Sequence, residues 1–450
     1  MRLKPLSSLL LAVLAGLTTT LGVPEAAACS KTPISDEAFE AFVEDGYFRD
    51  RQGDYRGAIE HFQRAIAMRP TNRKVRYLLA NTYWRDNQWT NARFAWETLL
   101  RMNPADKDGK EAVAWLRDYA REAWVPSVET LAGGGAGYVD GRGRAARFRN
   151  PNGMAVAASG NVYVTDTGNH RLRRVSPDGR VVTVAGSEQP GWADGPARSA
   201  RLFAPVGGAL DPAGNYFFAD GARVRFLTPS GMVGTLAGDY QAGWGDGGPG
   251  VGRFVRPVAV AADWRGYVVV SDNGTAIRLV SPDGQVRTVA GGLEPGWADG
   301  VGQEARFRYV SAMRMLDKNN VLLVDSGNNR LRELNLVSGK VKTHPGCSKA
   351  GYLDGPLEVA HWRELSGVAV DSYGNMLVAD GGNRAIRRIS LGRDVQTIAG
   401  GNAKGPPRDG PGLMARFGEP SELAMHGNTL YILDRQHHAV RRIQLGRMFN

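Results

Sequence analysis

The chain has 450 residues, 58 glycines and a formal net charge of +11. Its length exceeds that of one ordinary domain, and its glycine content is typical of a globular protein with many tight turns. The charge would suit a nucleic-acid partner, but much of it consists of arginines at repeated strand positions, for which we expect structural roles and no nucleic-acid partner.

Residues 1–28 have the pattern of a secretory signal. Arg2 and Lys4 precede an apolar run at residues 9–15, and small residues follow at 26–28. The run is too short to span a bilayer. We therefore expect an exported protein, either periplasmic or secreted.

Cys29 directly follows the expected cleavage position. Its lipidation would produce a lipoprotein, but Ala26 stands where a larger aliphatic residue is usual. Ordinary cleavage is therefore favoured, and membrane attachment is expected only if Cys29 is lipidated. The second cysteine is Cys347, and two hypotheses stay open for the pair: a disulfide, or two unpaired thiols.

Residues 36–124 have few glycines and a helical periodicity. Apolar residues recur at spacings of three and four within residues 55–66 and again within residues 92–99. Each run ends at a proline, Pro70 or Pro104, which cannot continue a helix. The two runs are related by a constant shift of 34 residues, which predicts a small all-α domain with two helical repeats.

This 34-residue shift resembles the tetratricopeptide repeat (TPR). The resemblance implies a concave groove for peptides or partner proteins, and a capping helix around residues 112–120 that covers the exposed end. In the register of the resemblance, the groove is lined by Tyr47, Lys74, Tyr77, Asn81 and Trp84. A docking role is favoured over a simple spacer, because two large aromatic residues would lie on the open side.

Residues 127–446 contain six copies of one segment. Each copy has an Asp-Gly step, a strand that ends in Asp and an arginine-bearing strand, and the first five copies continue into a final return strand. The Asp-Gly aspartates are Asp140, Asp194, Asp246, Asp299, Asp354 and Asp409, so the period is 52–55 residues. A fixed period of this size with several short strands per unit predicts a six-bladed β-propeller, with four strands from each unit.

The six units resemble NHL repeats, and the clearest motifs are the Ala-Arg-Phe triplets that begin at Ala146, Ala305 and Ala415. We therefore expect a mainly β protein: a six-bladed propeller of the NHL type, preceded by a small all-α TPR-like domain. The sixth unit lacks a fourth strand, and a matching segment precedes the first unit. We predict that residues 128–133 pair with residues 439–445 and close the ring.

Five aromatic residues and one arginine occupy equivalent places in the six units. They are Tyr138, Trp192, Trp244, Trp297, Tyr352 and Arg408. Because strand direction alternates, the loops that carry them share one face of the propeller with the loops between strands two and three. An aromatic rim could bind peptide or sugar, but their repetition favours a structural role, in which the rings fill gaps between blades.

Departures from the repeat are better pointers to a site. His170 lies in the loop between strands two and three of unit one, and His437 and His438 lie in that loop of unit six. A shared patch on these neighbouring blades is therefore a hypothesis. Six-bladed propellers include metal-dependent lactonases and amidating lyases, but adjacent residues of an extended chain point in opposite directions. We expect neither a metal site nor another cofactor.

These features predict an exported, non-catalytic binding or scaffold protein. Its propeller and TPR surfaces would dock protein or peptide partners, or glycans, at the cell envelope. The alternative is a propeller hydrolase or lyase, lactonase-like or amidating-lyase-like, that acts at the mouth of the central channel.

Overall fold

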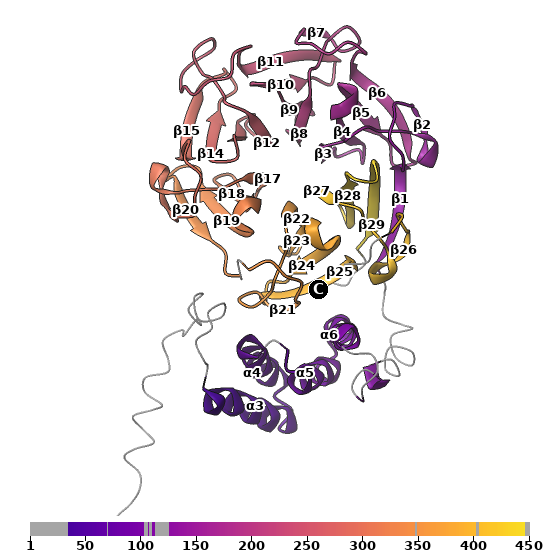
Figure 1. Ribbon diagram of the computed structural model, residues 1–450, viewed down its shortest axis with the longest axis vertical. Helices are drawn as coiled ribbons and strands as arrows, with labels where there is room; N and C mark the ends of the chain where they lie inside the picture. The colour runs from indigo at the N-terminus through magenta and orange to yellow at the C-terminus, as the bar shows by residue number, and fades with distance from the viewer. Residues whose placement is uncertain are drawn as a thin grey trace, which may run out of the picture.

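A computed structural model describes residues 35–69, 71–102, 107, 110–112, 126–346, 349–401 and 405–445. The predicted signal, the predicted capping helix beyond Ala112, Cys29 and Cys347 lie outside these residues. The described chain forms four helices followed by a ring of six β-sheets (Figure 1). The prediction of a mainly β, six-bladed propeller with a small helical domain before it is confirmed.

The four helices form two antiparallel pairs. They are α3 (Asp36–Arg51), α4 (Tyr55–Met68), α5 (Arg73–Arg85) and α6 (Trp89–Met102). Side chains of Ser35, Asp54 and Asn72 cap the first three helices by accepting a hydrogen bond from a backbone N–H in the first turn. Phe62 and Trp96, which are 34 residues apart, are both buried between the helices.

The first three blades follow each other in the chain. Blade 1 contains β2 (Gly141–Arg142), β3 (Gly153–Val156), β4 (Val162–Asp166), β5 (Arg171–Val175) and β6 (Arg180–Gly186). Blade 2 contains β7 (Gly195–Pro196), β8 (Pro205–Leu210), β9 (Tyr216–Asp220), β10 (Arg223–Leu227) and β11 (Met232–Gly238). Blade 3 contains β12 (Pro257–Ala262), β13 (Val268–Asp272), β14 (Ala276–Val280) and β15 (Val286–Gly291).

The last three blades complete the ring. Blade 4 contains β16 (Gly300–Val301), β17 (Val310–Met315), β18 (Asn320–Asp325), β19 (Arg330–Asn335) and β20 (Lys340–Thr343). Blade 5 contains β21 (Gly355–Pro356), β22 (Leu365–Val370), β23 (Met376–Asp380), β24 (Ala385–Ile389) and β25 (Asp394–Gly400). Blade 6 contains β26 (Gly410–Pro411), β27 (Pro420–His426), β28 (Thr429–Asp434), β29 (Ala439–Gln444) and β1 (Ser127–Gly133).

All strand pairs within the blades are antiparallel, and the first long strand of each blade lies innermost. Five blades carry one element more than the four strands expected from the sequence. The Asp-Gly step of the unit adds a two-residue strand to the outer edge of the same blade, as β2 does beside β6. In blade 3, a single β-bridge between Gly247 and Val286 takes the place of this short strand. These short segments cover backbone groups that would otherwise form a free sheet edge.

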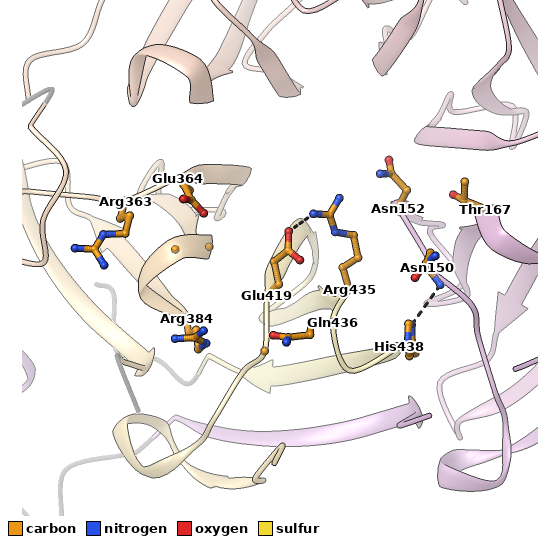
Figure 2. Close-up of a pocket in the computed structure, with 13 residues that line it drawn as sticks. Asn150, Asn152, Thr167, Arg363, Glu364, Arg384, Glu419, Arg435, Gln436 and His438 are labelled. Carbon is orange, nitrogen blue, oxygen red and sulfur yellow. Dashed lines mark hydrogen bonds and ion pairs between the residues drawn. The ribbon is translucent and has the colours of Figure 1, made fainter. Parts of the chain in front are cut away.

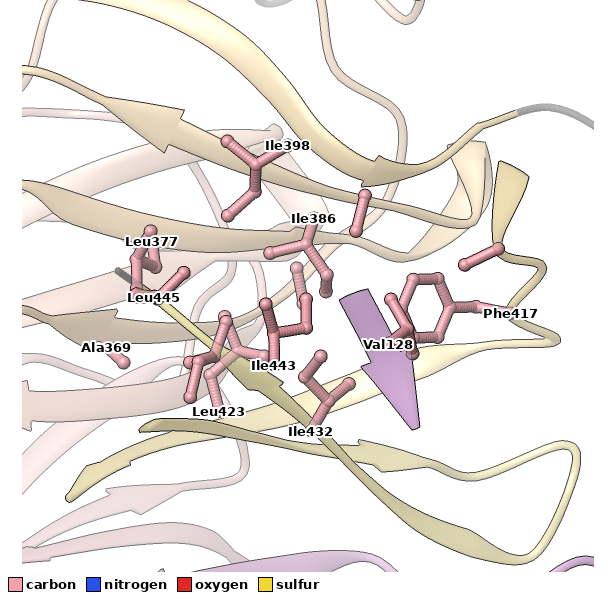
Figure 3. Close-up of a cluster of buried hydrophobic side chains, with 14 of the residues drawn as sticks. Val128, Ala369, Leu377, Ile386, Ile398, Phe417, Leu423, Ile432, Ile443 and Leu445 are labelled. Carbon is pink, nitrogen blue, oxygen red and sulfur yellow. The ribbon is translucent and has the colours of Figure 1, made fainter. Parts of the chain in front are cut away.

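Strand β1 is the outer long strand of blade 6. It runs antiparallel to β29, with Val128 opposite Ile443 and Gly133 opposite Ala439. The ring is therefore closed by hydrogen bonds between the beginning and the end of the propeller sequence. Val128 also packs with Ile443 and Phe417 in the hydrophobic cluster that joins blades 5 and 6 (Figure 3).

The helical domain packs against blade 5, beside β21 and β25 (Figure 1). Arg76 of α5 is buried, and its Nη2 donates a hydrogen bond of 2.8 Å to the carbonyl oxygen of Asp354. Phe94 of α6 belongs to the same hydrophobic cluster as Ile398 of β25. This contact makes Asp354 only 8% exposed, whereas the equivalent aspartates of the other five blades are 32–48% exposed.

Candidate functional site

A buried arginine ties each blade together. The third strand of every blade carries one fully buried arginine: Arg173, Arg225, Arg278, Arg332, Arg387 and Arg441. In blade 1, Arg173 forms ion pairs of 2.6 Å with both Asp166 and Asp140. The other blades repeat both pairs. A buried guanidinium needs such partners, so these recurring charges have a structural role.

The strand-ending aspartates are also fully buried in all six blades. Burial raises the pKa of Asp166, Asp220 and Asp272 above the ordinary value. Burial acts in the same direction on Asp434, but the contacts with His437, the backbone N–H of Glu419 and Arg441 together outweigh it, and the pKa of Asp434 is lowered. His437 Nδ1 lies 2.9 Å from Asp434 Oδ2. His437, one of the candidate site residues, is therefore hydrogen-bonded within its own blade.

The five aromatic candidates each lie over a guanidinium group. The pairs are Tyr138 with Arg171 at 3.9 Å, Trp192 with Arg223 at 5.5 Å, Trp244 with Arg278 at 4.6 Å, Trp297 with Arg330 at 5.2 Å and Tyr352 with Arg387 at 5.3 Å, measured to the ring centre. At the sixth place, the carbonyl of Arg408 accepts a hydrogen bond of 2.8 Å from Arg441. These cation–π contacts supply a structural role for the rings, and ligand binding by the rim stays a prediction.

His170 and His438 occupy the same place in neighbouring blades, where the backbone is left-handed, with φ of 57° and 50°. Each reaches toward the next blade in the ring. His170 Nδ1 contacts the carbonyl of Phe203, and His438 Nδ1 accepts a hydrogen bond of 3.3 Å from the backbone N–H of Asn150. Burial lowers the pKa of His438, which favours the neutral ring that can accept this bond.

Blades 5, 6 and 1 enclose a pocket of about 950 Å³ on the face that carries the loops between strands two and three. We call it the loop-face pocket. Figure 2 shows the side chains converging on it from these three blades. Its lining consists of Asn150, Asn152, Thr167, Arg363, Glu364, Gly381, Gly382, Arg384, Gly418, Glu419, Arg435, Gln436 and His438. Of the histidine candidates, His438 is in this set, and His170 and His437 are not.

Charges of both signs line the loop-face pocket. Arg435 and Glu419 form an ion pair (Figure 2). Arg363 and Glu364 of blade 5 are exposed, and neither forms an ion pair within the described part of the chain. Blade 5 therefore offers two guanidinium groups, of Arg363 and Arg384, and the carboxylate of Glu364, and blade 6 offers a neutralised pair.

Sequence reasoning missed most of these polar residues. It singled out the loop that contains His438, but not Glu419, which follows Arg416-Phe417, or Arg363 and Glu364, which follow His361-Trp362 at the same place in unit five. Arg149 of blade 1 and Arg308 of blade 4 are equivalent to Arg363 of blade 5. In all three, the backbone N–H donates a hydrogen bond to the strand-ending Asp of the same blade. One unit by itself therefore contains no signal for the pocket.

A second cavity, of about 340 Å³, adjoins the loop-face pocket at the mouth of the central channel. The two cavities share Asn152, Glu364, Gly381, Glu419 and Arg435 among their lining residues. The lining of the mouth is asymmetric. Blades 4, 5 and 6 supply serines, whereas blades 2 and 3 supply valines at the corresponding strand starts: Ser311, Ser366, Ser421, Val206 and Val258.

The groove candidates of the helical domain lie on α3 and α5. Tyr47 is 44% exposed, and Arg51 lies over its ring. Lys74 is exposed, whereas Tyr77, Asn81 and Trp84 are half-buried. Tyr77 packs edge-on against Trp96, with 5.1 Å between ring centres. Partner binding by this groove stays a prediction.

Two further properties bear on the kind of site. In the described segments, no three His, Cys, Asp or Glu side chains lie close enough together to hold a metal ion. Helices long and apolar enough to cross a bilayer are likewise absent from the described residues.

Fold and sequence together define the chain as a six-bladed β-propeller with NHL repeats and an N-terminal TPR region. The tetratricopeptide repeat model matches residues 51–116, and the NHL repeat model matches residues 148–175. The predicted resemblance to both repeat families is confirmed.

Two curated proteins are similar to 59% of this chain. One is the chloroplastic protein SUPPRESSOR OF QUENCHING 1 of Arabidopsis thaliana, which is 27% identical over 287 residues. The other is NHL repeat-containing protein 2 of Gallus gallus, which is 24% identical over 307 residues. The aligned regions span only 27% and 42% of those two proteins.

Solved structures with the same fold include two proteins from Bacteroides thetaiotaomicron. A structural genomics protein of unknown function has a TM-score of 0.55 and 20% identity, and an auxiliary nutrient binding protein has a TM-score of 0.53 and 13% identity. In both cases the match covers 71% of this chain and 76% of the other. At these identities, the likeness is one of fold.

Proposed function

We propose that this chain is an exported, non-catalytic binding protein that holds a polar segment of a protein partner in the loop-face pocket. The observation that carries the proposal is the pocket itself. It has about 950 Å³ of space, and its lining comes from blades 5 and 6 and from blade 1, which is distant from them in sequence. Its volume is in the usual range of ligand-binding clefts, and its polar groups converge from three blades.

The chemistry of the lining supports a peptide rather than a glycan. No aromatic side chain is among the lining residues, and sugar rings generally need aromatic faces to stack on. Amides, a free guanidinium and a free carboxylate suit the polar backbone and charged side chains of a peptide. Arg363 and Glu364 would provide the two charges.

The helical domain would supply a second contact with the same partner. It packs on blade 5 through Arg76, and blade 5 also supplies Arg363 and Arg384 to the loop-face pocket. The two surfaces are therefore held by one blade. A partner that touches both would bind more tightly than either contact alone allows.

Export of the protein is part of the proposal and is supported by the basic start and short apolar run of residues 1–28. The site of action would then be the cell envelope. Fractionation of the native cells, with N-terminal sequencing of the mature chain, checks this part separately.

The binding proposal is tested with arrays of peptides and of glycans, probed with the purified mature protein. Peptides that bind the wild type should bind at least tenfold more weakly to a protein with Arg363→Ala and Arg435→Ala. Arg308→Ala is the matched control, because Arg308 occupies the place of Arg363 in blade 4, outside the pocket. Binding only to glycans, or equal loss in the control, would contradict the proposal.

A further inference from the structure

The innermost strands carry small residues in two rings. In each blade, the strand that ends in Asp pairs with the innermost strand. The innermost-strand residues that pair with the position three residues before that Asp form the first ring: Ala155, Ala209, Ala261, Arg314, Ala369 and Ala424. The innermost-strand residues that pair with the position directly before the Asp form the second ring: Gly153, Val206, Ala259, Ala312, Gly367 and Glu422. Each ring thus has five small residues and one long, charged one.

Both exceptions line one cavity in the central channel. It has a volume of about 210 Å³, and Arg314 and Glu422 are its only charged lining residues. The remaining lining is apolar or glycine and includes Met313 and Met425. In register the two rings are two residues apart, about 6.6 Å along a strand. Among the described residues, no ion pair joins Arg314 to Glu422, although blades 4 and 6 direct both into the same space.

A third polar group lies beside this cavity without a partner. The hydroxyl of Tyr216 is buried, and no described group is hydrogen-bonded to it. It lies where a side chain on Gly208 would lie, and Gly208 lines the cavity. Tyr216 is fully buried and does not itself line the cavity, so its hydroxyl is not available to a ligand there.

Electrostatics favours an anion in this space. Burial raises the pKa of Glu422 to about 8, so its carboxyl group is mainly protonated at neutral pH. The side chain of Arg314 is exposed, and an arginine keeps its charge at any ordinary pH. The cavity therefore holds one positive charge that a neutral Glu422 does not compensate, together with the hydroxyl donor of that carboxyl group.

We propose that the channel cavity is a binding site for a small carboxylate, held by the guanidinium of Arg314 and by a hydrogen bond from Glu422. A guanidinium matches the two oxygens of a carboxylate in a fork-like geometry. The apolar wall would accommodate a short alkyl group. Arg314 lines neither the loop-face pocket nor the second cavity, whereas Glu422 also lines the second cavity at the channel mouth.

Acetate is the probe, titrated into the purified mature protein at pH 7 by calorimetry. Wild-type protein should bind acetate, and its melting temperature should rise more in sodium acetate than in sodium chloride at equal ionic strength. Arg314→Ala should weaken acetate binding at least tenfold. This variant restores the alanine found in the other five blades, so its fold should be retained.

Two further variants make the result specific. Glu422→Gln keeps a neutral hydrogen-bond donor and should bind acetate within threefold of wild type. Arg308→Ala removes a charge on the same blade, outside the cavity, and should bind like wild type. The proposal is overturned if wild-type protein does not bind acetate, if chloride gives the same rise in melting temperature, or if Arg314→Ala binds equally well.

Discussion

Thr130 and Asp409 are 279 residues apart in the chain and are joined by two hydrogen bonds. The backbone N–H of Thr130 donates to Asp409 Oδ2 at 3.1 Å, and its hydroxyl donates to Oδ1 at 2.9 Å. In blade 1, Thr183 makes the same two bonds to Asp140, only 43 residues away. The N-terminal strand thus completes the sixth blade with the two interactions that blades 1, 3, 4 and 5 each form within one unit.

The first prediction concerns this closure. Thr130→Val should lower the free energy of unfolding by about 1 kcal/mol, because the hydroxyl loses its bonds with Asp409 and Arg144, and should speed amide hydrogen exchange in β1. Denaturant unfolding and hydrogen exchange measure the two effects. Thr183→Val is the control: it should cost a similar free energy but should not speed exchange in β1. Unchanged exchange in β1 of the Thr130 variant would contradict the prediction.

The second prediction concerns the buried arginines. Arg173→Met should destabilise the propeller by about 3–5 kcal/mol, because the buried carboxylate of Asp166 loses its ion-pair partner. Its neighbour Arg174 is half-buried, and Arg174→Met should cost less than about 1 kcal/mol. Denaturant unfolding of the two variants makes the comparison. An equal loss of unfolding free energy in the two variants would contradict the prediction that the buried ion pair stabilises the blade.

The third prediction concerns the contact between helices and propeller. Arg76→Ala should loosen the helical domain, because the buried bond to the carbonyl of Asp354 is lost. Limited proteolysis should then cleave within residues 35–102 at least several-fold faster, with little change in propeller unfolding. Arg56→Ala, an exposed position on α4, should leave the cleavage rate unchanged. Cleavage of Arg76→Ala at the wild-type rate would mean that this bond does not hold the domain.

The fourth prediction concerns pH. Asp394 of β25 is buried near the helical domain, and burial raises its pKa to about 6. The folded state therefore binds a proton more readily than the unfolded state, so this group stabilises the fold at low pH. That contribution is complete below pH 3.8, the ordinary pKa, and is lost as pH rises through 6.

Asp394→Asn removes this titration. The free energy of unfolding of the wild type, relative to the variant, should fall by about 1 kcal/mol between pH 5 and pH 8. Denaturant unfolding at the two values measures the change. Asp283→Asn, in an exposed turn of blade 3, is the control and should show no such difference. A relative stability that rises with pH would contradict the sign.

Local sequence patterns were sufficient for the repeat architecture. The Asp-Gly step and the strand-ending Asp recur in each unit because the same buried arginine needs both carboxylates. The interactions behind the pattern are short in sequence, 33 residues or fewer in blade 1. The short fifth strand was missed, because two residues are too few to show any strand periodicity.

The amino-acid sequence by itself determined the number of blades, the helical repeats and the order of strands, since each depends on periodic burial within one unit. Only the tertiary structure decided where the helical domain packs and which polar residues share a pocket. Those outcomes depend on side chains such as Arg363 and His438, which lie on different blades and meet because the ring closes. The sequence of one repeat unit does not show which residues of the other blades will lie beside it in the closed ring.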